Sequence, residues 1–212
     1  MFEFILFDLD DTLYPRSAGL MDEVGLRIQV WLCDHLDLSW EEARRLRRAY
    51  YHQYGTTLGG LVAEHEIDAS NYLFFVHDIP LHTYLAPNPA LAEMLQSIPL
   101  RKVIYTNATS DYGWRVLETL GVRDHFEQVF GIEEVCLRNK PYQEAYEQVL
   151  LALDAWGPTC IMVEDSARNL HPAKALGMRT VLVGSQPDRH VDFWVPSVLD
   201  VGDVVTQILE DK

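Results

Sequence analysis

The sequence predicts an α/β protein whose core is a doubly wound parallel sheet and which carries an inserted all-α subdomain. Two observations lead to this fold class. Short apolar runs alternate with helical patterns in the second half of the chain, and this alternation is typical of a parallel sheet covered by helices on both faces. The interval between the first two apolar runs breaks the rhythm, because it holds several helical patterns and no convincing strand.

The expected strands and helices can be placed from their hydrophobic patterns. Five short runs are apolar and contain β-branched or aromatic residues, as buried strands do. They cover residues 2–7, 102–105, 128–130, 160–163 and 180–183. Helical patterns occur at residues 111–120, 141–153 and 169–176, and Gly177 is a stop signal for the last of them. This order predicts a Rossmann-like core.

The helical insert is expected to cover residues 15–87, which leaves residues 1–14 and 88–212 as the core domain. An apolar stripe at helical spacing runs through residues 20–36. Ser39 and Glu42 form a capping-box signature for the next helix. Pro87 marks the return to the core domain.

The composition of this 212-residue chain narrows the range of functions. Its 17 basic and 32 acidic residues give a formal charge of −15, so most of the surface would repel a nucleic-acid polymer. Cys33, Cys136 and Cys160 are odd in number and lack CxxC spacing, which favours buried thiols in a reducing compartment. No apolar stretch approaches the length of a membrane span. We therefore expect a cytoplasmic protein that does not act at a membrane.

Polar clusters follow the predicted strands where each strand ends. Ligands of open α/β sheets bind outside the carboxyl ends of the strands, so these clusters are the candidate site. The clusters are Asp8, Asp10, Asp11 and Thr12; Thr106 and Asn107; Lys140 and Pro141; and Glu164, Asp165 and Ser166 with Asn169.

The three acids at Asp8, Asp10 and Asp11 are the most informative of these clusters. A lone aspartate at a strand end is most often a turn or helix cap. Three acids within four residues repel one another unless a cation neutralises them, and hard oxygen ligands favour Mg²⁺. Asp165 ends an apolar run, where a charge is costly unless it is paired or metal-bound.

Two further residues have both a plain and a functional interpretation. Thr106 can cap the helix that follows, yet its place after a strand also suits a hydroxyl that donates to a phosphate oxygen. Lys140 can be a solvated surface lysine, yet it precedes Pro141 at an expected helix start, where anions collect.

Taken in order, these motifs resemble those of the haloacid dehalogenase superfamily. The matching residues are the DLDDT run from Asp8 to Thr12, then Thr106, then Lys140, then the acidic pair Glu164 and Asp165. The helical insert resembles the cap domain of that superfamily. The run Leu13-Tyr14-Pro15 and the segment 50–61 are similar to the pyrimidine 5′-nucleotidase branch.

The resemblance implies a phosphatase that works through a covalent intermediate. Asp8 would attack phosphorus to form an aspartyl-phosphate, and Asp10 would act first as the acid and then as the base. Mg²⁺ would be held by the Asp8 carboxylate, the Asp10 backbone carbonyl and Asp165. Glu164 would act through water, outside the ligand sphere.

The resemblance also assigns the groups that bind the phosphate and the leaving group. Lys140 and Thr106 would stabilise the charge on the phosphoryl oxygens, with Asn107 beside them, and Asn169 would orient Lys140. In the insert, the residues expected to meet the leaving group are Tyr51, His52, Tyr54 and Thr56, although each can equally serve helix packing.

Some polar residues of the insert are given no ligand. The Arg44-Arg45 and Arg47-Arg48 pairs are interpreted as mainly a solvated helix face, because an apolar stripe lies between them. His77 with Asp78 resembles a metal-binding pair only as a dipeptide, and no other His-rich cluster with ligand spacing supports it, so a structural role is expected.

The expected activity is hydrolysis of a small phosphate monoester, in particular a pyrimidine nucleoside 5′-monophosphate. A sugar phosphomutase or sugar-phosphate phosphatase would carry the same motifs. A 2-haloacid dehalogenase is disfavoured because Asp10 would have no task there. A phosphorylatable signalling receiver is disfavoured because Lys140 precedes the second acidic pair and a large insert is present. The sequence leaves the oligomeric partner open.

Overall fold

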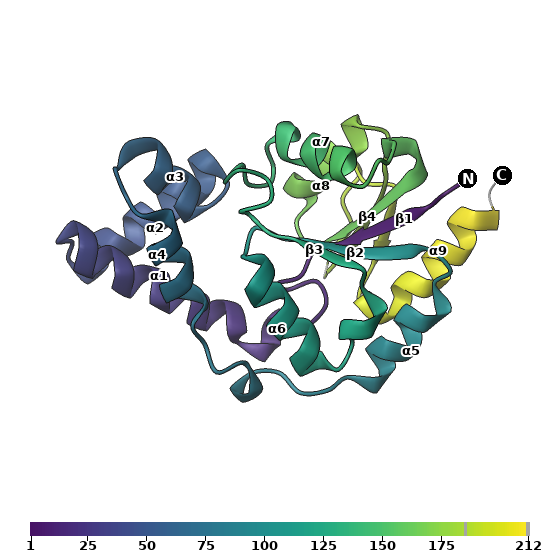
Figure 1. Ribbon diagram of the computed structural model, residues 1–212, viewed down its shortest axis with the longest axis horizontal. Coiled ribbons are helices and arrows are strands. Elements are labelled where there is room, and N and C mark those ends of the chain that lie inside the picture. The colour runs from purple at the N-terminus through teal and green to yellow at the C-terminus, as the bar shows by residue number, and fades with distance from the viewer. Residues whose placement is uncertain (185, 211–212) are drawn as a thin grey trace.

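A computed structural model describes residues 1–184 and 186–210 (Figure 1). Its strands form one parallel sheet in the order β3-β2-β1-β4-β5-β6. The strands are β1 (Phe4–Phe7), β2 (Arg101–Tyr105), β3 (Gln128–Phe130), β4 (Cys160–Glu164), β5 (Arg179–Val183) and β6 (Phe193–Val195). This order reverses direction beside β1, which makes the sheet doubly wound. The predicted fold class is confirmed.

Helices cover both faces of the sheet (Figure 1). On one face lie α7 (Gln143–Ala152) and α8 (Ala167–Ala175), and on the other lie α5 (Pro89–Ser97), α6 (Ser110–Leu120) and α9 (Val201–Glu210). Side chains of β1 alternate between two hydrophobic clusters, as the period of a strand requires. Phe4 and Leu6 join the cluster that includes α7 and α8, whereas Ile5 and Phe7 join the cluster that includes α5, α6 and α9.

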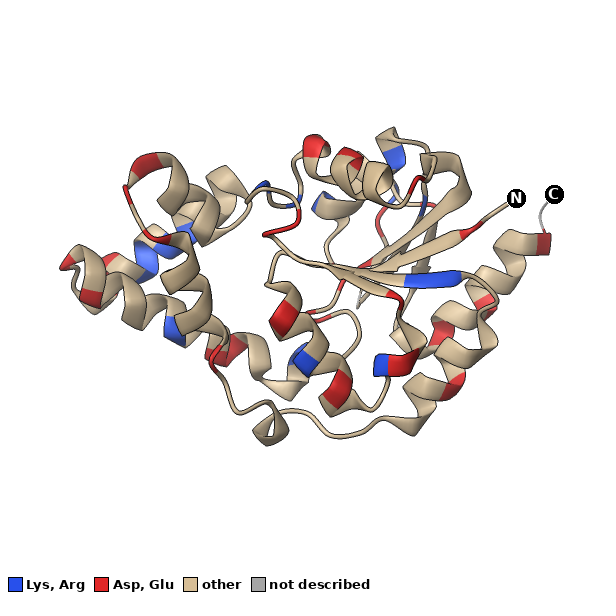
Figure 2. Cartoon of the chain, in the orientation of Figure 1, with Lys and Arg blue, Asp and Glu red and all other residues tan. Residues whose placement is uncertain are grey.

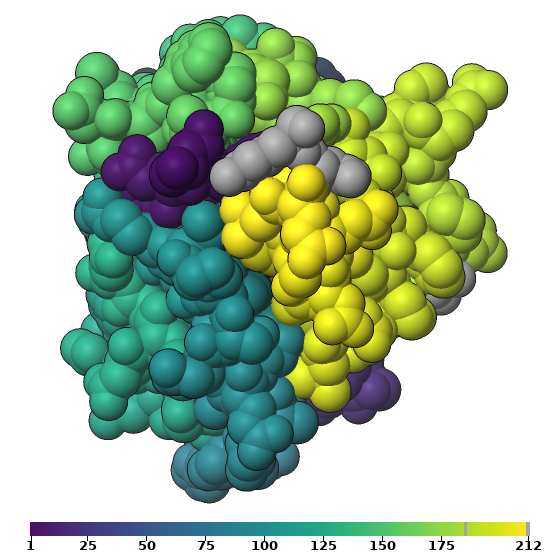
Figure 3. All heavy atoms as spheres, turned by 90° about the vertical axis from the view of Figure 1, so that its right-hand side faces the viewer, coloured from purple at the N-terminus to yellow at the C-terminus, as the bar shows by residue number. Residues whose placement is uncertain are grey.

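The insert folds as four helices that pack on one another beyond the carboxyl edge of the sheet (Figure 1). They are α1 (Leu20–Leu36), α2 (Trp40–Tyr54), α3 (Thr57–Glu64) and α4 (Ala69–His77). The capping box at the start of α2 is present: the Ser39 hydroxyl accepts from the Glu42 amide, and the Glu42 carboxylate accepts from the Ser39 amide. The opposite end of the molecule carries the N-terminal strand beside α5 and α9 (Figure 3).

The register of the central strands places three strand ends at one level. Phe7 pairs with Ile104 of β2 and with Val163 of β4. The next residues along these strands are Asp8, Tyr105 and Glu164, so the polar clusters that follow β1, β2 and β4 meet at one edge. This edge faces the insert.

The structure differs from the sequence prediction in several places. Strand β6 and helix α9 were not predicted. Helix α7 begins at Gln143 with Tyr142 as its N-cap, so Lys140 does not stand at a helix start as predicted. Cys160 is buried, but Cys136 is exposed, which corrects the prediction that all three thiols are buried. Within the described residues, no helix has the length and apolar character needed to cross a membrane.

Candidate active site

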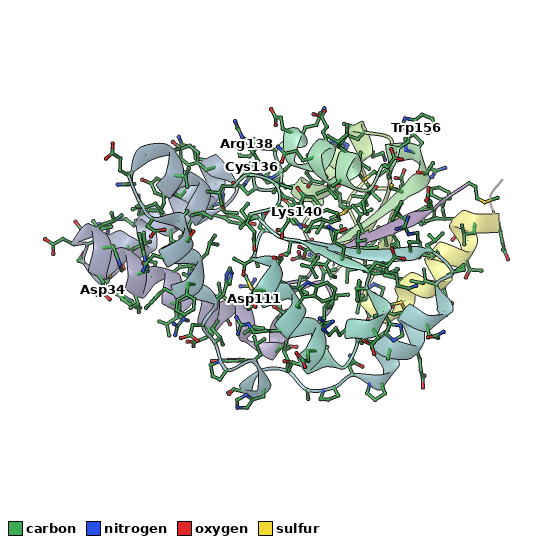
Figure 4. All side chains as sticks on the ribbon, in the orientation of Figure 1. Asp34, Asp111, Cys136, Arg138, Lys140 and Trp156 are labelled. Atoms are coloured by element: carbon green, nitrogen blue, oxygen red, sulfur yellow. The ribbon has the colours of Figure 1, made fainter. Side chains whose placement is uncertain are left out.

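The centre of the site is a buried lysine between two carboxylates. Lys140 Nζ lies 2.6 Å from Asp8 Oδ1 and 2.9 Å from Glu164 Oε1, and it also donates to the Tyr105 carbonyl at 2.9 Å. Figure 4 shows Lys140 where the sheet meets the insert. All three ionisable side chains are almost completely buried. Burial raises the pKa of the Asp8 carboxyl, while the nearby Lys140 charge lowers it.

Glu164 has every oxygen engaged. Its Oε1 accepts from the Lys140 ammonium and, at 2.6 Å, from the side-chain amide of Asn169. Its Oε2 accepts from the backbone amide of Ser166 at 2.6 Å. A carboxylate with this many donors orients its neighbours rather than reacting. The structure therefore connects Asn169 to Lys140 through Glu164.

Asp10 lies beside two tyrosines to which the sequence assigned no role at the site. The hydroxyls of Tyr14 and Tyr112 both donate to Oδ1 of Asp10, the second at 3.0 Å. Burial raises the pKa of Asp10 to about 6, and the two hydrogen bonds oppose that rise. A carboxyl in this range can give and take a proton near neutral pH, as a general acid and base must.

Thr106 and Asn107 have different contacts. The Thr106 Oγ1 accepts from the Ala108 amide at 3.0 Å, and within the described residues its hydroxyl donates no hydrogen bond. The side chain lines the cavity above Asp8, so the hydroxyl proton is free for a ligand. Asn107 instead brackets the Lys140 backbone: Oδ1 accepts from the Lys140 amide at 2.7 Å, and Nδ2 donates to the Lys140 carbonyl at 3.2 Å. This geometry lets Asn107 position Lys140, and Asn107 also lines the cavity.

The acidic side chains can hold a hard divalent cation. One carboxylate oxygen each from Asp8, Glu164 and Asp165 lie within 4.8 Å of one another. Reduced hydration in the cavity and the charges of Glu164 and Asp8 raise the pKa of the Asp165 carboxyl. A cation relieves this repulsion, and oxygen donors are the ligands that Mg²⁺ prefers. Since Glu164 is fully hydrogen-bonded, Asp8 and Asp165 are the side chains that fit a direct role.

A cavity of about 480 Å³ separates these residues from the insert. Its volume suits a small organic ligand. The sheet side contributes Asp8, Asp10, Thr106, Lys140 and Asp165. The insert contributes residues from α1, α2, α4 and the start of α3, including Arg47, Arg48, Tyr51, His52, Thr56 and Tyr72.

Three of the four insert residues predicted to meet a leaving group line the cavity, and the fourth does not. Tyr51, His52 and Thr56 line the cavity, although the Thr56 hydroxyl also caps α3 by accepting from the Gly59 amide at 2.9 Å. Tyr54 is not among the lining residues. Its hydroxyl donates to Glu64, and this contact joins α2 to α3 within the insert. The geometry therefore gives Tyr54 a structural contact instead of the predicted substrate contact.

The basic residues of α2 also differ from the prediction. Arg44 and Arg45 are exposed and lie near Glu41, as a solvated helix face requires. Arg47 is partly buried, and Arg47 and Arg48 both line the cavity. Figure 2 shows basic residues on α2 while acidic residues are spread over the whole chain. The sequence did not predict that Arg47 and Arg48 line the cavity, because the face that α2 turns toward the core depends on where α1 packs.

The last turn of α2 is attached to the core by two side chains that the sequence did not reveal. Arg168 of α8 donates to the carbonyls of Tyr51 at 3.1 Å and His52 at 3.2 Å. Asn139 donates to the Tyr54 carbonyl at 2.9 Å. The last carbonyls of a helix lack partners within the helix, so these donors hold the insert over the site.

Comparison with known proteins identifies the family. The family model described as haloacid dehalogenase-like hydrolase matches residues 2–177. Phosphate metabolism protein 8 of Saccharomyces cerevisiae is 27% identical over 199 residues, which cover 83% of this chain but only 60% of the yeast protein. Glyceraldehyde 3-phosphate phosphatase of Methanocaldococcus jannaschii is 25% identical, and the match covers all of both chains. Ribulose-1,5-bisphosphate 5-phosphatase of Halopiger xanaduensis is 28% identical, covering 84% of this chain and 83% of the relative.

A solved structure shows the same fold. The CbbY protein of Rhodobacter sphaeroides, determined with phosphate, superposes with a TM-score of 0.67 at 19% identity, covering 95% of this chain and 97% of that one. The matched family model spans strands β1 to β4, the insert and every strand-end motif of the site. This chain therefore belongs to the haloacid dehalogenase-like hydrolase family.

Proposed function

We propose that this protein is a magnesium-dependent phosphatase that hydrolyses a small phosphate monoester through an aspartyl-phosphate. The observation that carries the proposal is the arrangement of two carboxyls at one cavity: Asp8 is fixed by Lys140, and Asp10 is fixed by Tyr14 and Tyr112. Residues 15–87 serve in this proposal as the cap, and residues 1–14 and 88–212 as the core.

In the first step, an Asp8 carboxylate oxygen attacks phosphorus and the ester P–O bond breaks. Asp10 gives its proton to the leaving alkoxide. In the second step, Asp10 takes a proton from water, the water oxygen attacks phosphorus, and the acyl-phosphate P–O bond breaks to release phosphate and restore Asp8. Dividing the reaction in this way replaces one difficult displacement by two easier ones.

The surrounding groups stabilise charge during both steps. The Thr106 hydroxyl would donate to a phosphoryl oxygen. The positive charge of Lys140, whose three N–H groups already hold Asp8, Glu164 and the Tyr105 carbonyl, would stabilise the negative charge of the transferred group. Mg²⁺ bound by Asp8 and Asp165 would neutralise part of the charge on the transferred group. Arg168 and Asn139 hold the cap beside the site.

The test is phosphate release by the purified protein with Mg²⁺. Asp8→Asn removes the nucleophile with little change of shape, so it is expected to abolish release and trapping of a beryllofluoride adduct. Asp34→Asn is the matched control, because Asp34 is exposed on the far part of α1 (Figure 4). Substantial turnover by Asp8→Asn would refute the covalent mechanism. Isomerised sugar phosphate without release would identify a phosphomutase.

Two leaving groups compete within this proposal. A pyrimidine nucleoside is supported by the resemblance of segment 50–61 and by Tyr51 and His52 at the cavity, since aromatic rings can stack on a base. A sugar or triose is supported by the names of two relatives, which act on glyceraldehyde 3-phosphate and ribulose 1,5-bisphosphate. Comparing kcat/KM for UMP, CMP, AMP and these sugar phosphates decides between them. A preference for UMP and CMP over AMP supports the nucleotidase.

A further inference from the structure

Arg47 of α2 packs closely against Gly25 of α1. Its guanidinium lies against α1 and donates from Nη1 to the Gly25 carbonyl. A Cβ at Gly25 would overlap the flexible end of Arg47, so a larger residue there would push the guanidinium from its present place.

Arg47 also lacks a carboxylate partner within the described chain. Three other arginines at the cavity or on α2 do have carboxylates nearby: Arg44 and Arg45 lie near Glu41, and Arg16 pairs with Asp11 at 3.1 Å. Partial burial and the neighbouring Arg48 lower the pKa of Arg47, and the more distant charge of Asp22 only partly opposes this. A partly buried cation without a counterion is unfavourable unless an anion binds there.

The unpaired guanidinium faces the same cavity as Asp8, from the opposite wall. Tyr72 and Thr57, both buried, line the cavity beside it and offer hydroxyl groups. Burial raises the pKa of the Tyr72 hydroxyl, and the nearby Arg47 charge lowers it. Arg48 adds a second positive charge on this wall. The wall is thus cationic in a chain whose formal charge is −15.

We infer that Arg47, with Arg48, binds a second anionic group of the substrate, at the end remote from the phosphate that is cleaved. The substrate class is a small phosphate monoester that also bears a phosphate or a carboxylate. The guanidinium fork suits either anion, because both accept paired hydrogen bonds. This inference deepens the proposed function and rests on it for the assignment of Asp8 to the cleaved phosphate.

Matched substrate pairs test the inference. Ribose 1,5-bisphosphate is compared with ribose 5-phosphate, and 3-phosphoglycerate is compared with glycerol 3-phosphate. The wild type is expected to prefer the doubly anionic member of at least one pair by about 10- to 100-fold in kcat/KM, as one charge-assisted interaction provides. Preference in the first pair alone identifies a second phosphate, and preference in the second pair identifies a carboxylate.

Two variants should remove the preference by different routes. Arg47→Met removes the guanidinium but keeps most of the packed volume. Gly25→Ala keeps the guanidinium and displaces it by the steric overlap described above. Both are expected to lower the preference about 10-fold or more. Arg45→Met, on the exposed side of the same helix, is the control and should keep the wild-type ratio.

Binding separates failure of this inference from failure of the proposed function. Calorimetric titration of Asp8→Asn with Mg²⁺ should show tighter binding of the preferred doubly anionic compound than of its partner, and adding Arg47→Met should abolish the difference. This result without wild-type turnover would refute the phosphatase proposal alone. Equal binding within both pairs, or a ratio that persists in Arg47→Met, would refute the second-anion site. A fall in the melting temperature without a change in ratio would show that Arg47 only packs α2 on α1.

Discussion

Lys140 Nζ lies 2.6 Å from Asp8 Oδ1, although the two residues are 132 positions apart in the sequence. The same ammonium group contacts Glu164 at the end of β4 and the Tyr105 carbonyl at the end of β2. One buried cation thus joins the ends of three neighbouring strands. Because its two acidic partners are also buried, removing the cation leaves their charges uncompensated.

Lys140→Met is therefore expected to destabilise the fold and to abolish turnover. Breaking a buried ion pair by removing one partner typically costs about 3–5 kcal/mol. The free energy of unfolding is measured by urea denaturation in EDTA, so that no added cation replaces the lysine. Lys174→Met is the control, since Lys174 is partly exposed and pairs with Asp192 at 3.2 Å, and such a pair contributes about 0–1 kcal/mol. Equal stability of wild type and Lys140→Met would contradict this account.

Tyr112→Phe is expected to slow catalysis without unfolding the protein. The change removes one of the two donors to Asp10 and leaves Tyr14 in place. A lost hydrogen bond to a charged group is worth about 1.5–3 kcal/mol, so kcat should fall by about 10- to 100-fold. Steady-state phosphate release measures the effect. Tyr84→Phe removes a hydroxyl that donates to Glu23 instead, and a similar loss of kcat in that variant would argue against a specific role for Tyr112.

Chelation by EDTA is expected to abolish turnover, and Mg²⁺ should restore it. Ca²⁺ should inhibit, because its looser coordination permits both oxygens of the nucleophile to bind the ion. Mg²⁺ should also raise the melting temperature of the wild type, since a ligand at 100 times its dissociation constant stabilises by about 2.7 kcal/mol.

Asp165→Asn provides the matched test of the cation site. In EDTA, this variant should melt above the wild type, because one of the mutually repelling carboxylates is gone. Its melting temperature should respond weakly to Mg²⁺. An equal Mg²⁺ shift in both proteins would place the ion elsewhere.

Arg168→Met is expected to loosen the insert from the core. The change removes the two hydrogen bonds to the Tyr51 and His52 carbonyls. Small-angle scattering should show a larger radius of gyration, and KM should rise by about 5- to 10-fold, as the loss of two solvent-exposed hydrogen bonds allows. Arg168→Lys retains one donor, so its radius of gyration and its KM should lie between those of the wild type and those of Arg168→Met. Unchanged scattering and kinetics would mean that other contacts hold the insert.

His77 makes stability depend on pH. It is buried at the end of α4 and stacks on Tyr112 with ring centroids 4.6 Å apart. Burial, with a smaller contribution from Arg115, lowers its pKa to about 4 from 6.5. The unfolded chain therefore binds a proton before the folded one does, so the free energy of unfolding falls as pH drops from 6.5 towards 4, by about 3 kcal/mol in total.

Comparison with His77→Phe isolates that contribution, because the raised pKa values of the buried carboxyls change stability in the opposite direction. Between pH 6.5 and pH 5, the wild type should lose about 2 kcal/mol more than His77→Phe in urea denaturation. Equal losses would show that His77 does not remain neutral in the folded protein.

Local patterns were sufficient to predict much of this architecture. Strands β1 to β5 are short apolar runs, and their signal lies in consecutive residues, as do the capping box of Ser39 and Glu42 and the apolar stripe of α1. The three-residue strand β6 has Trp194 partly exposed, so its sequence carries little periodic signal. The acids after β1 and β4 could be placed at one edge because parallel strands share their carboxyl edge.

The sequence by itself determined where the strands end and which residue types follow them, since both depend on neighbours in the chain. Tertiary structure alone decided which side chains meet. Tyr112 donates a hydrogen bond to Asp10, which is 102 positions away in the sequence. Tyr54 donates to Glu64, and Arg47 lines the cavity. Each of these directions depends on how one helix packs against another. Helix packing is set by complementary surfaces from distant segments, which no local period of a sequence specifies.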